Sequence, residues 1–155
     1  MSAMRKLQMT GLGVLMAWSG GAAALTDDQQ ACVIEAAQAA AGRYPAAKLG
    51  DAVAEVEAKA IAGTKFVNSL TSPAAFASAV AGRLGLFTAT EVERIKDAQA
   101  RGAPDESRML LGEKLISAAS SATLVRVPLS IAGQSAQAAY TCLMVRERAL
   151  IAPAR

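Results

Sequence analysis

Two cysteines, Cys32 and Cys142, lie near the two ends of this 155-residue chain, and they constrain its fold more than any other feature. Because there is no third cysteine, only one internal pairing is possible. In the chain-entropy model, a bridge that closes about a hundred residues destabilises the unfolded state by roughly 4 to 5 kcal/mol. A pairing therefore predicts that the segments around the two cysteines pack together. Whether they pair depends on the compartment that the protein occupies.

The first 24 residues have the three regions of a secretory signal peptide. Arg5 and Lys6 give residues 1–8 a positive charge without any acid, and residues 9–18 are apolar or small. The segment then ends in small residues up to Ala24, the type of sequence that a signal peptidase reads. This pattern predicts export and cleavage after Ala24.

Two alternatives to a cleaved signal peptide fit the sequence less well. An uncleaved anchor would have to span roughly 30 Å of hydrocarbon, whereas about ten apolar residues form a helix of about 15 Å. A lipid anchor on Cys32 is disfavoured, because Gln29-Gln30-Ala31 differs from the sequence that precedes a lipoprotein cysteine. We expect a periplasmic or secreted bacterial protein with no stable membrane span and with Cys32 and Cys142 in a structural disulfide.

The charge of the chain gives no support to a nucleic-acid partner. The formal net charge is +3, but two of the sixteen bases lie in the predicted signal peptide, which contains none of the thirteen acids. A protein that binds nucleic acid would need clustered bases and a positive field. The one tryptophan, Trp18, also lies in the signal peptide, so few aromatic residues remain for a stacking platform.

The chain contains no histidine. This excludes Ser-His-Asp and Cys-His constellations, haem held by a proximal histidine, and histidine-containing zinc sites within this polypeptide. The sequence also lacks a calcium-loop pattern, a phosphate-binding glycine loop and a cysteine-rich metal spacing. We therefore expect no cofactor and no metal.

Capping residues and hydrophobic spacing predict four or five short helices before residue 120. They are expected at residues 27–42, 46–62, 73–84, about 91–101 and 106–119, with a loop at 101–107. Thr26 and Gln29 form a capping box for the first helix, and Ser72-Pro73 and Gly85 bound the third. For the fourth helix, Thr90 with Glu93 is the preferred capping box, and Thr88 with Glu91 is the competing one.

The expected helix over residues 46–62 is amphipathic. Leu49, Val53 and Val56 recur at three- and four-residue spacing and are expected to face the core. Glu55 and Lys59 are placed as an i, i+4 ion pair on another face. A coiled-coil seam is the alternative interpretation, but the pattern covers only two heptads.

After residue 121 the hydrophobic period changes from about 3.6 to 2. This predicts strands over residues 122–132 and 137–146, joined by a turn at 133–135, with Cys142 facing the same core as Tyr140. Pro128 indicates that the first strand lies at a sheet edge or that Pro128 occupies a position without a ladder hydrogen bond.

These elements predict an α+β fold in which four or five short helices pack on one face of a small antiparallel C-terminal hairpin or sheet. The length suits a single domain. We expect residues 25–148 to form the exported domain and residues 149–155 to form a loosely ordered tail.

Few residues point to chemistry. Glu35 lies in the middle of the first helix, where burial would suit its carboxyl group to general-acid work. Gly133-Gln134-Ser135 resembles the start of a nucleophile elbow, but a hairpin turn fits this segment better. Arg146 and Arg148 are either a solvated strand end or a contact for a partner.

Because histidine-dependent, cofactor and metal chemistries are excluded or without a motif, the sequence favours a non-catalytic module. Such a module would bind another envelope or extracellular protein by strand addition or by helix contact. An accessory subunit of an envelope assembly is a variant of this hypothesis. The alternative is a carboxylate-dependent cell-envelope hydrolase with Glu35 as its general acid. The sequence leaves the oligomeric state open.

Overall fold

The computed structural model describes residues 24–154, so the predicted signal peptide, residues 1–24, lies outside the described residues except for Ala24. The described chain begins with one helix and two short strands, continues with four consecutive helices and ends in three strands. In order they are α1 (Asp27–Arg43), β1 (Lys48–Leu49), β2 (Val53–Val56), α2 (Lys59–Asn68), α3 (Pro73–Leu84), α4 (Ala89–Ala100), α5 (Pro104–Ala118), β3 (Ala119–Ile131), β4 (Gln134–Val145) and β5 (Arg148–Pro153). The predicted α+β class is confirmed.

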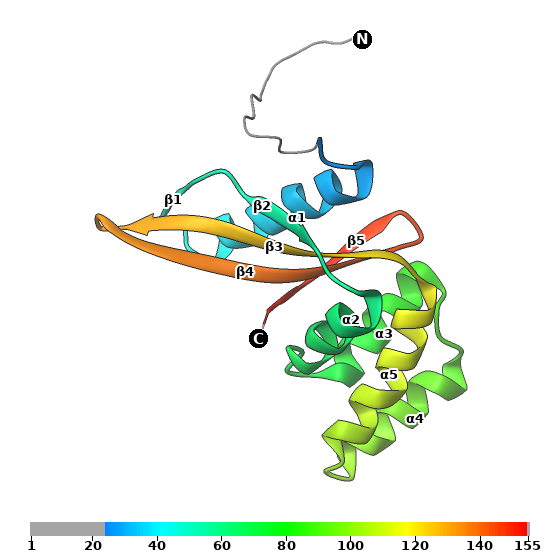
Figure 1. The fold of residues 1–155 in the computed structure, drawn as a ribbon. Coiled ribbons are helices and arrows are strands. Elements are labelled where there is room, and N and C mark those ends of the chain that lie inside the picture. The colour runs from blue at the N-terminus through cyan, green and yellow to red at the C-terminus, as the bar shows by residue number, and fades with distance from the viewer. Residues whose placement is uncertain (1–23, 155) are drawn as a thin grey trace.

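The antiparallel sheet lies between two layers of helix, with α1 on one face and α2–α5 on the other (Figure 1). The prediction that the helices cover one face is therefore wrong. The reason is visible in β4, where Tyr140 and Cys142 pack toward α1 while Leu143 and Val145 pack toward α2–α5. Because both faces of this strand are apolar, each face needs a cover that excludes water.

β3 lies inside the sheet, whose strand order is β1-β3-β4-β5 with β2 also pairing with β3. The predicted alternative in which this strand lies at a sheet edge is therefore wrong. Pro128 is accommodated because β1 pairs only with Leu129 and Ser130, and β2 reaches only as far as Arg126. Pro128 therefore lies opposite the break between these two short strands, where a missing N–H costs little.

The helix caps follow the sequence closely. Thr26 and Gln29 form the predicted capping box of α1. Ser72 caps α3, which ends at Leu84 before Gly85 in the left-handed conformation, as predicted. Helix α4 uses the competing capping box of Thr88 and Glu91. Helix α5 begins at Pro104, so the predicted loop at 101–107 is shorter than expected.

The prediction of one helix over residues 46–62 is wrong. This segment forms β1, β2 and the start of α2, and Glu55 pairs with Arg126 across the strands instead of with Lys59. Valine is stiff at χ1 and suits a pleated strand, and the four-residue ladder with β3 adds hydrogen bonds that a local helical pattern cannot foresee.

The two C-terminal hairpins are tight. β3 and β4 form the predicted pair of strands, and the turn between them consists of Ala132 and Gly133, both with positive φ. The expectation of a loosely ordered tail over residues 149–155 is corrected by β5, which pairs with β4 along its whole length. No helix within residues 24–154 combines the length and the apolar character needed to cross a bilayer.

Candidate functional site

The predicted disulfide between Cys32 and Cys142 is present and joins α1 to β4. The two Cα atoms are 5.9 Å apart, and both side chains are fully buried in the core between α1 and the sheet. Burial makes the bridge structural, since a reactive sulfur must be reached by its substrate. Such a bridge is consistent with an oxidising, non-cytoplasmic compartment.

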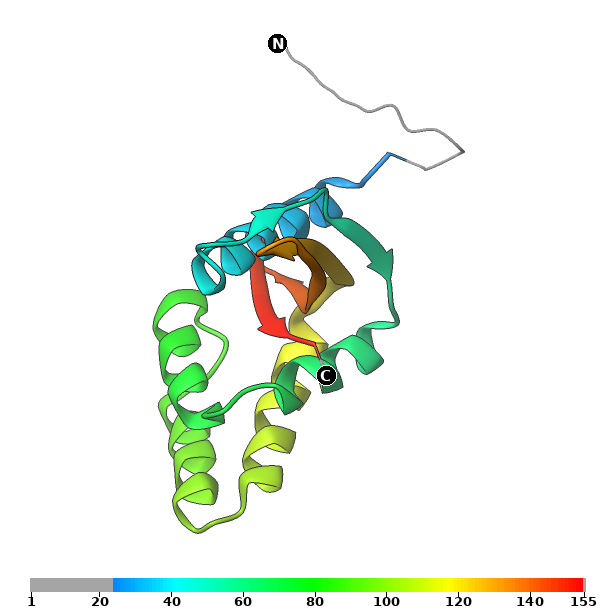
Figure 2. The same ribbon diagram turned by 90° about the vertical axis from the view of Figure 1, so that its left-hand side faces the viewer.

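A groove of about 440 Å³ lies beside the first half of β5, between α1 and the C-terminal end of α3. We call it the β5 groove. It is lined by Ala31, Ile34, Glu35, Arg83, Glu147, Arg148, Ala149 and Leu150. In Figure 2, α1 lies above β5 and α3 lies to one side of it. Its volume lies within the range of about 300 to 1,000 Å³ that is typical of ligand sites.

The inner wall of this groove is the free edge of the sheet, because β5 is the last strand in the order. A two-residue turn closes with a hydrogen-bonded pair, here Val145 with Arg148, and the bonded pairs then alternate along the ladder. The bond from the Ala154 N–H to the Ala139 carbonyl, 2.9 Å long, continues the same alternation. The backbone N–H and C=O groups of Ala149 and Ile151 therefore point away from β4.

Four charged side chains line the β5 groove, two acidic and two basic. They are Glu35, Arg83, Glu147 and Arg148. None of them forms an ion pair or a side-chain hydrogen bond with another residue in the range 24–154. Ile34, which is 51% exposed, adds an apolar contact beside these charges. The groove thus offers exposed, unpaired charges of both signs next to backbone groups that point away from β4.

The turn at the end of the groove has an unusual backbone. Its two residues, Arg146 and Glu147, have φ of 49° and 65°, the left-handed region that favours glycine or asparagine. Arg146 has a structural partner, since its guanidinium donates a hydrogen bond to the carbonyl of Leu84, the last residue of α3. The turn is thereby tied to α3 on the opposite side of the groove from α1.

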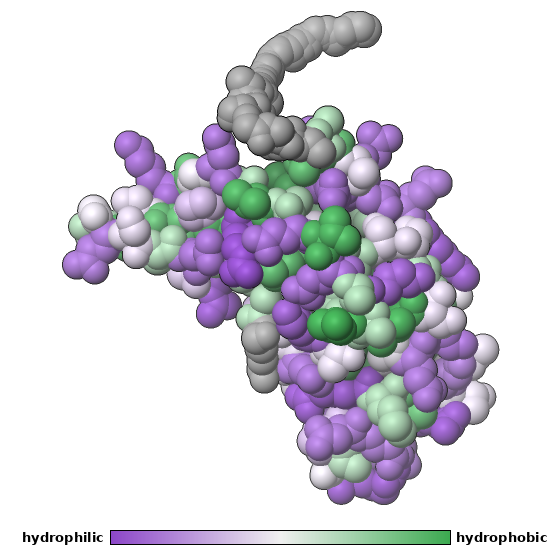
Figure 3. Space-filling model, viewed as in Figure 1, coloured by the Kyte–Doolittle hydropathy of each residue, from purple (hydrophilic) through white to green (hydrophobic). Residues whose placement is uncertain are grey.

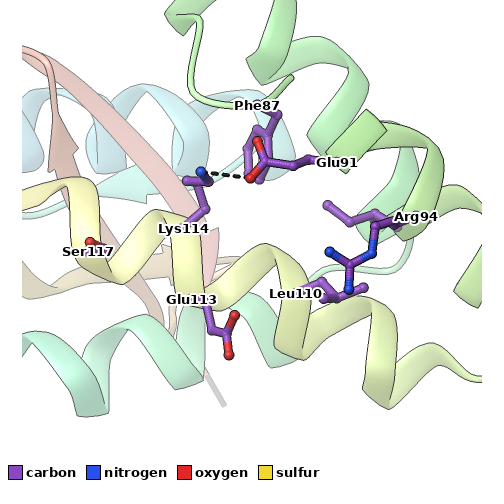
Figure 4. Close-up of a pocket in the computed structure, with 8 residues that line it drawn as sticks. Phe87, Glu91, Arg94, Leu110, Glu113, Lys114 and Ser117 are labelled. Atoms are coloured by element: carbon purple, nitrogen blue, oxygen red, sulfur yellow. Dashed lines mark ion pairs between the residues drawn. The ribbon is translucent and has the colours of Figure 1, made fainter. Parts of the chain in front are cut away.

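A second, smaller pocket of about 290 Å³ lies between α4 and α5. Figure 4 shows Lys114 reaching across to Glu91, and their charged atoms are 2.8 Å apart. The hydrogen bond from Lys114, followed by the backbone N–H of Thr88, holds the pKa of Glu91 below its usual value. Because this pair neutralises itself and Glu91 also caps α4, helix packing accounts for the arrangement.

Hydrophobic side chains also gather over β2 and α2, on a face that is otherwise largely hydrophilic (Figure 3). Val53, Val56 and Ile61 are 51%, 78% and 56% exposed. The expectation that Leu49, Val53 and Val56 form part of the core is therefore wrong. The spacing that suggested a buried helix face belongs to an exposed strand edge.

The structure brings together some of the residues that the sequence singled out. Glu35 and Arg148 line the same groove, with Glu147 as a second carboxylate. Glu35 is exposed, however, so the burial on which its role as a general acid depended is absent. Gly133 and Gln134 lie at the hairpin between β3 and β4, as the alternative to a nucleophile elbow requires.

The sequence analysis does not predict the β5 groove, because it assigns the residues of β5 to a loosely ordered tail. The sequence signal for this strand is a short apolar run, Ala149-Leu150-Ile151-Ala152, between Arg148 and Pro153. Within residues 24–154, no group of three or more aspartate, glutamate or cysteine side chains is placed to hold a metal ion.

Searches of protein-family models, of curated proteins and of solved structures found no match for this chain. The proposed function therefore rests on the geometry of the β5 groove.

Proposed function

We propose that this protein is a small, exported, non-catalytic module that binds an extended segment of another envelope or extracellular protein. The segment adds as a further strand beside β5. The observation that carries the proposal is the free β5 edge lying in a charged groove between α1 and α3. The periplasm or the extracellular space is the proposed location, because the buried disulfide suits an oxidising compartment.

Strand addition uses the groups that this edge presents. An added strand bonds with the outward N–H and C=O groups of Ala149 and Ile151, which have no backbone partner within residues 24–154. Natural sheets usually protect such an edge with charges or a covering element, because it otherwise recruits unrelated chains. Here the charged side chains that line the β5 groove restrict binding to segments whose own charges complement them.

The four rim charges suit recognition. Glu35, Arg83, Glu147 and Arg148 are available to a partner, since none is paired within the described chain. Charges of this kind at the edge of an interface steer association and exclude wrong partners more than they add affinity. A matching segment must carry both acidic and basic side chains.

The proposal is tested by selecting linear 12-residue peptides from a random display library against the oxidised protein. We expect the selected peptides to protect the amide protons of Ala149 and Ile151 from hydrogen exchange. The variant Ala149→Pro removes an outward N–H and leaves the ladder to β4 intact, so it should weaken binding by at least tenfold.

Asp51→Pro is the matched control. It places a proline in the exposed connection between β1 and β2, at the opposite side of the sheet, and should leave peptide binding unchanged. Peptides that bind the parent protein and Ala149→Pro equally well, or the absence of any selected peptide, would overturn strand addition at β5.

The carboxylate-dependent hydrolase is the second candidate, and one observation favours it: Glu35 and Glu147 line the same groove. Paired carboxylates can cleave glycosidic bonds without histidine. Release of soluble fragments from purified cell-envelope polymer, abolished by Glu35→Gln, would support this function. No release by the parent protein would reject it.

A further inference from the structure

We infer that Glu147 is the specificity-determining residue of the β5 groove and that it selects a lysine or arginine side chain of the bound segment. This inference rests on the proposed function and adds the chemistry of the partner to it. It begins from a conflict between the backbone at position 147 and the residue that occupies it.

Position 147 is a place where glycine is the favourable residue. It is the second residue of a two-residue hairpin turn and has φ of 65°. The other tight hairpin of this protein has the same construction at residues 132–133, and there the second residue is Gly133, with φ of 81°. A glutamate at the equivalent place strains the backbone, because its Cβ disfavours the left-handed region.

The hairpin that this turn closes holds the backbone in place, but no ion pair or side-chain hydrogen bond within residues 24–154 accounts for a glutamate at position 147. The carboxylate of Glu147 is exposed and has no ion pair or hydrogen-bond partner within residues 24–154. Its neighbour Arg146 is strained in the same way but bonds to the end of α3. A strained residue whose charged side chain has no partner in the fold is a candidate for a role in binding.

The surroundings of Glu147 define the group that it recognises. Glu35 lines the same groove from α1, so a second carboxylate adds to the negative charge that a cationic side chain meets there. Arg83 and Arg148 line the same groove and exclude a segment that carries only positive charge. Because alternate side chains of an added strand share a face, one basic residue of the segment can meet the carboxylates while its backbone pairs with β5.

The test uses Glu147→Gly, which removes the carboxylate and relieves the backbone. We expect the melting temperature to rise by a few degrees, because glycine adopts this conformation without a steric cost. The affinity for peptides selected on the parent protein should fall at least tenfold. The preference for a lysine over a glutamate at the critical peptide position should disappear in Glu147→Gly and reverse in Glu147→Lys.

Glu113→Gln, at an exposed glutamate of α5 outside the β5 groove, is the matched control and should change neither readout. If Ala149→Pro abolishes peptide binding while Glu147→Gly keeps its affinity and charge preference, strand addition stands and the role of Glu147 is overturned. A lower melting temperature for Glu147→Gly would also overturn it, since Glu147 would then be structural. If no peptide depends on Ala149, both inferences fail.

Discussion

Gly63 lies in the middle of α2, where this helix packs against α5. A Cβ built at this position would lie 2.3 Å from Cγ1 of Ile116, far inside contact distance. At Gly82, in α3, the same added carbon would meet no atom within 4 Å apart from the adjacent residues and the backbone of its own helix. Both glycines are helical, so the two positions separate the effect of close packing from the effect of backbone freedom.

We predict opposite outcomes for Gly63→Ala and Gly82→Ala. Gly82→Ala should stabilise the fold by about 0.5 to 1 kcal/mol, because alanine restricts the unfolded chain. Gly63→Ala should destabilise it by about 1 to 3 kcal/mol through overpacking against Ile116. Urea unfolding measures both. A stabilised Gly63→Ala would show that α2 and α5 separate at little cost, whereas partial recovery in Gly63→Ala with Ile116→Ala would locate the clash.

At the scale of the element, α4 shows how one side chain links a helix end to its neighbour. Glu91 accepts a hydrogen bond from the Lys114 ammonium of α5 and from the backbone N–H of Thr88. Both partners favour the ionised carboxylate, so the folded pKa lies below the unfolded value of about 4.5. Because the folded pKa is lowered, ionised Glu91 stabilises the fold at pH values above the unfolded pKa. This stabilisation is lost as the pH falls through the folded pKa.

We predict that Glu91→Gln is less stable than the parent protein at pH 7 and that the difference shrinks as the pH falls below about 4.5. Glutamine preserves an acceptor for the capping box but removes the ion pair with Lys114. Thermal unfolding between pH 7 and pH 3 measures the difference. Glu93→Gln is the control, because Glu93 has only an exposed pair with Lys96. A difference between parent and Glu91→Gln that stays constant with pH would contradict a stabilising role for the ionised carboxylate.

At the scale of the whole molecule, the sheet separates two cores that differ in how they are held. The buried residues that α1 contributes to its core with the sheet are all small, namely Cys32, Ala36 and Ala40, whereas the helices on the other side contribute Phe66, Ile95, Leu111 and Leu115. Phe66 and Phe76 meet edge to face there, with ring centres 5.5 Å apart. Small residues on α1 bring the helix close to the sheet but bury less apolar area per residue, so the covalent bridge supports that layer.

We predict that replacing both cysteines with alanine lowers the free energy of unfolding by roughly 3 to 5 kcal/mol, because Cys32 and Cys142 close a long loop. The melting temperature should fall by on the order of 10 °C. Because both cysteines are fully buried, thiol reductant should act slowly on the folded protein and quickly in denaturant. A double variant within 2 °C of the oxidised parent would show that α1 is held by packing alone.

Local signals were sufficient for the parts of the fold that depend on neighbouring residues. The helix from Pro73 to Leu84 needs only the Ser72 cap, the proline and the positive φ of Gly85, all of which are local. The change of period near residue 120 predicted β3 and β4, because alternation of apolar side chains is a property of the strand itself. The disulfide was predicted from the cysteine count together with the predicted signal peptide.

Only the tertiary structure decided the pairing partners and therefore the candidate site. Val53 and Val56 have a spacing compatible with a helix, and the ladder with β3 overrides it. The β5 groove combines residues of α1, α3 and the β4–β5 turn, which lie far apart along the chain. The sequence by itself determined the caps, the period and the bridge, since these depend on short-range geometry and residue type. The free edge of β5 and the charged side chains beside it depend on how α1, α3 and the sheet pack together. This packing is driven by the burial of apolar side chains on both faces of β4.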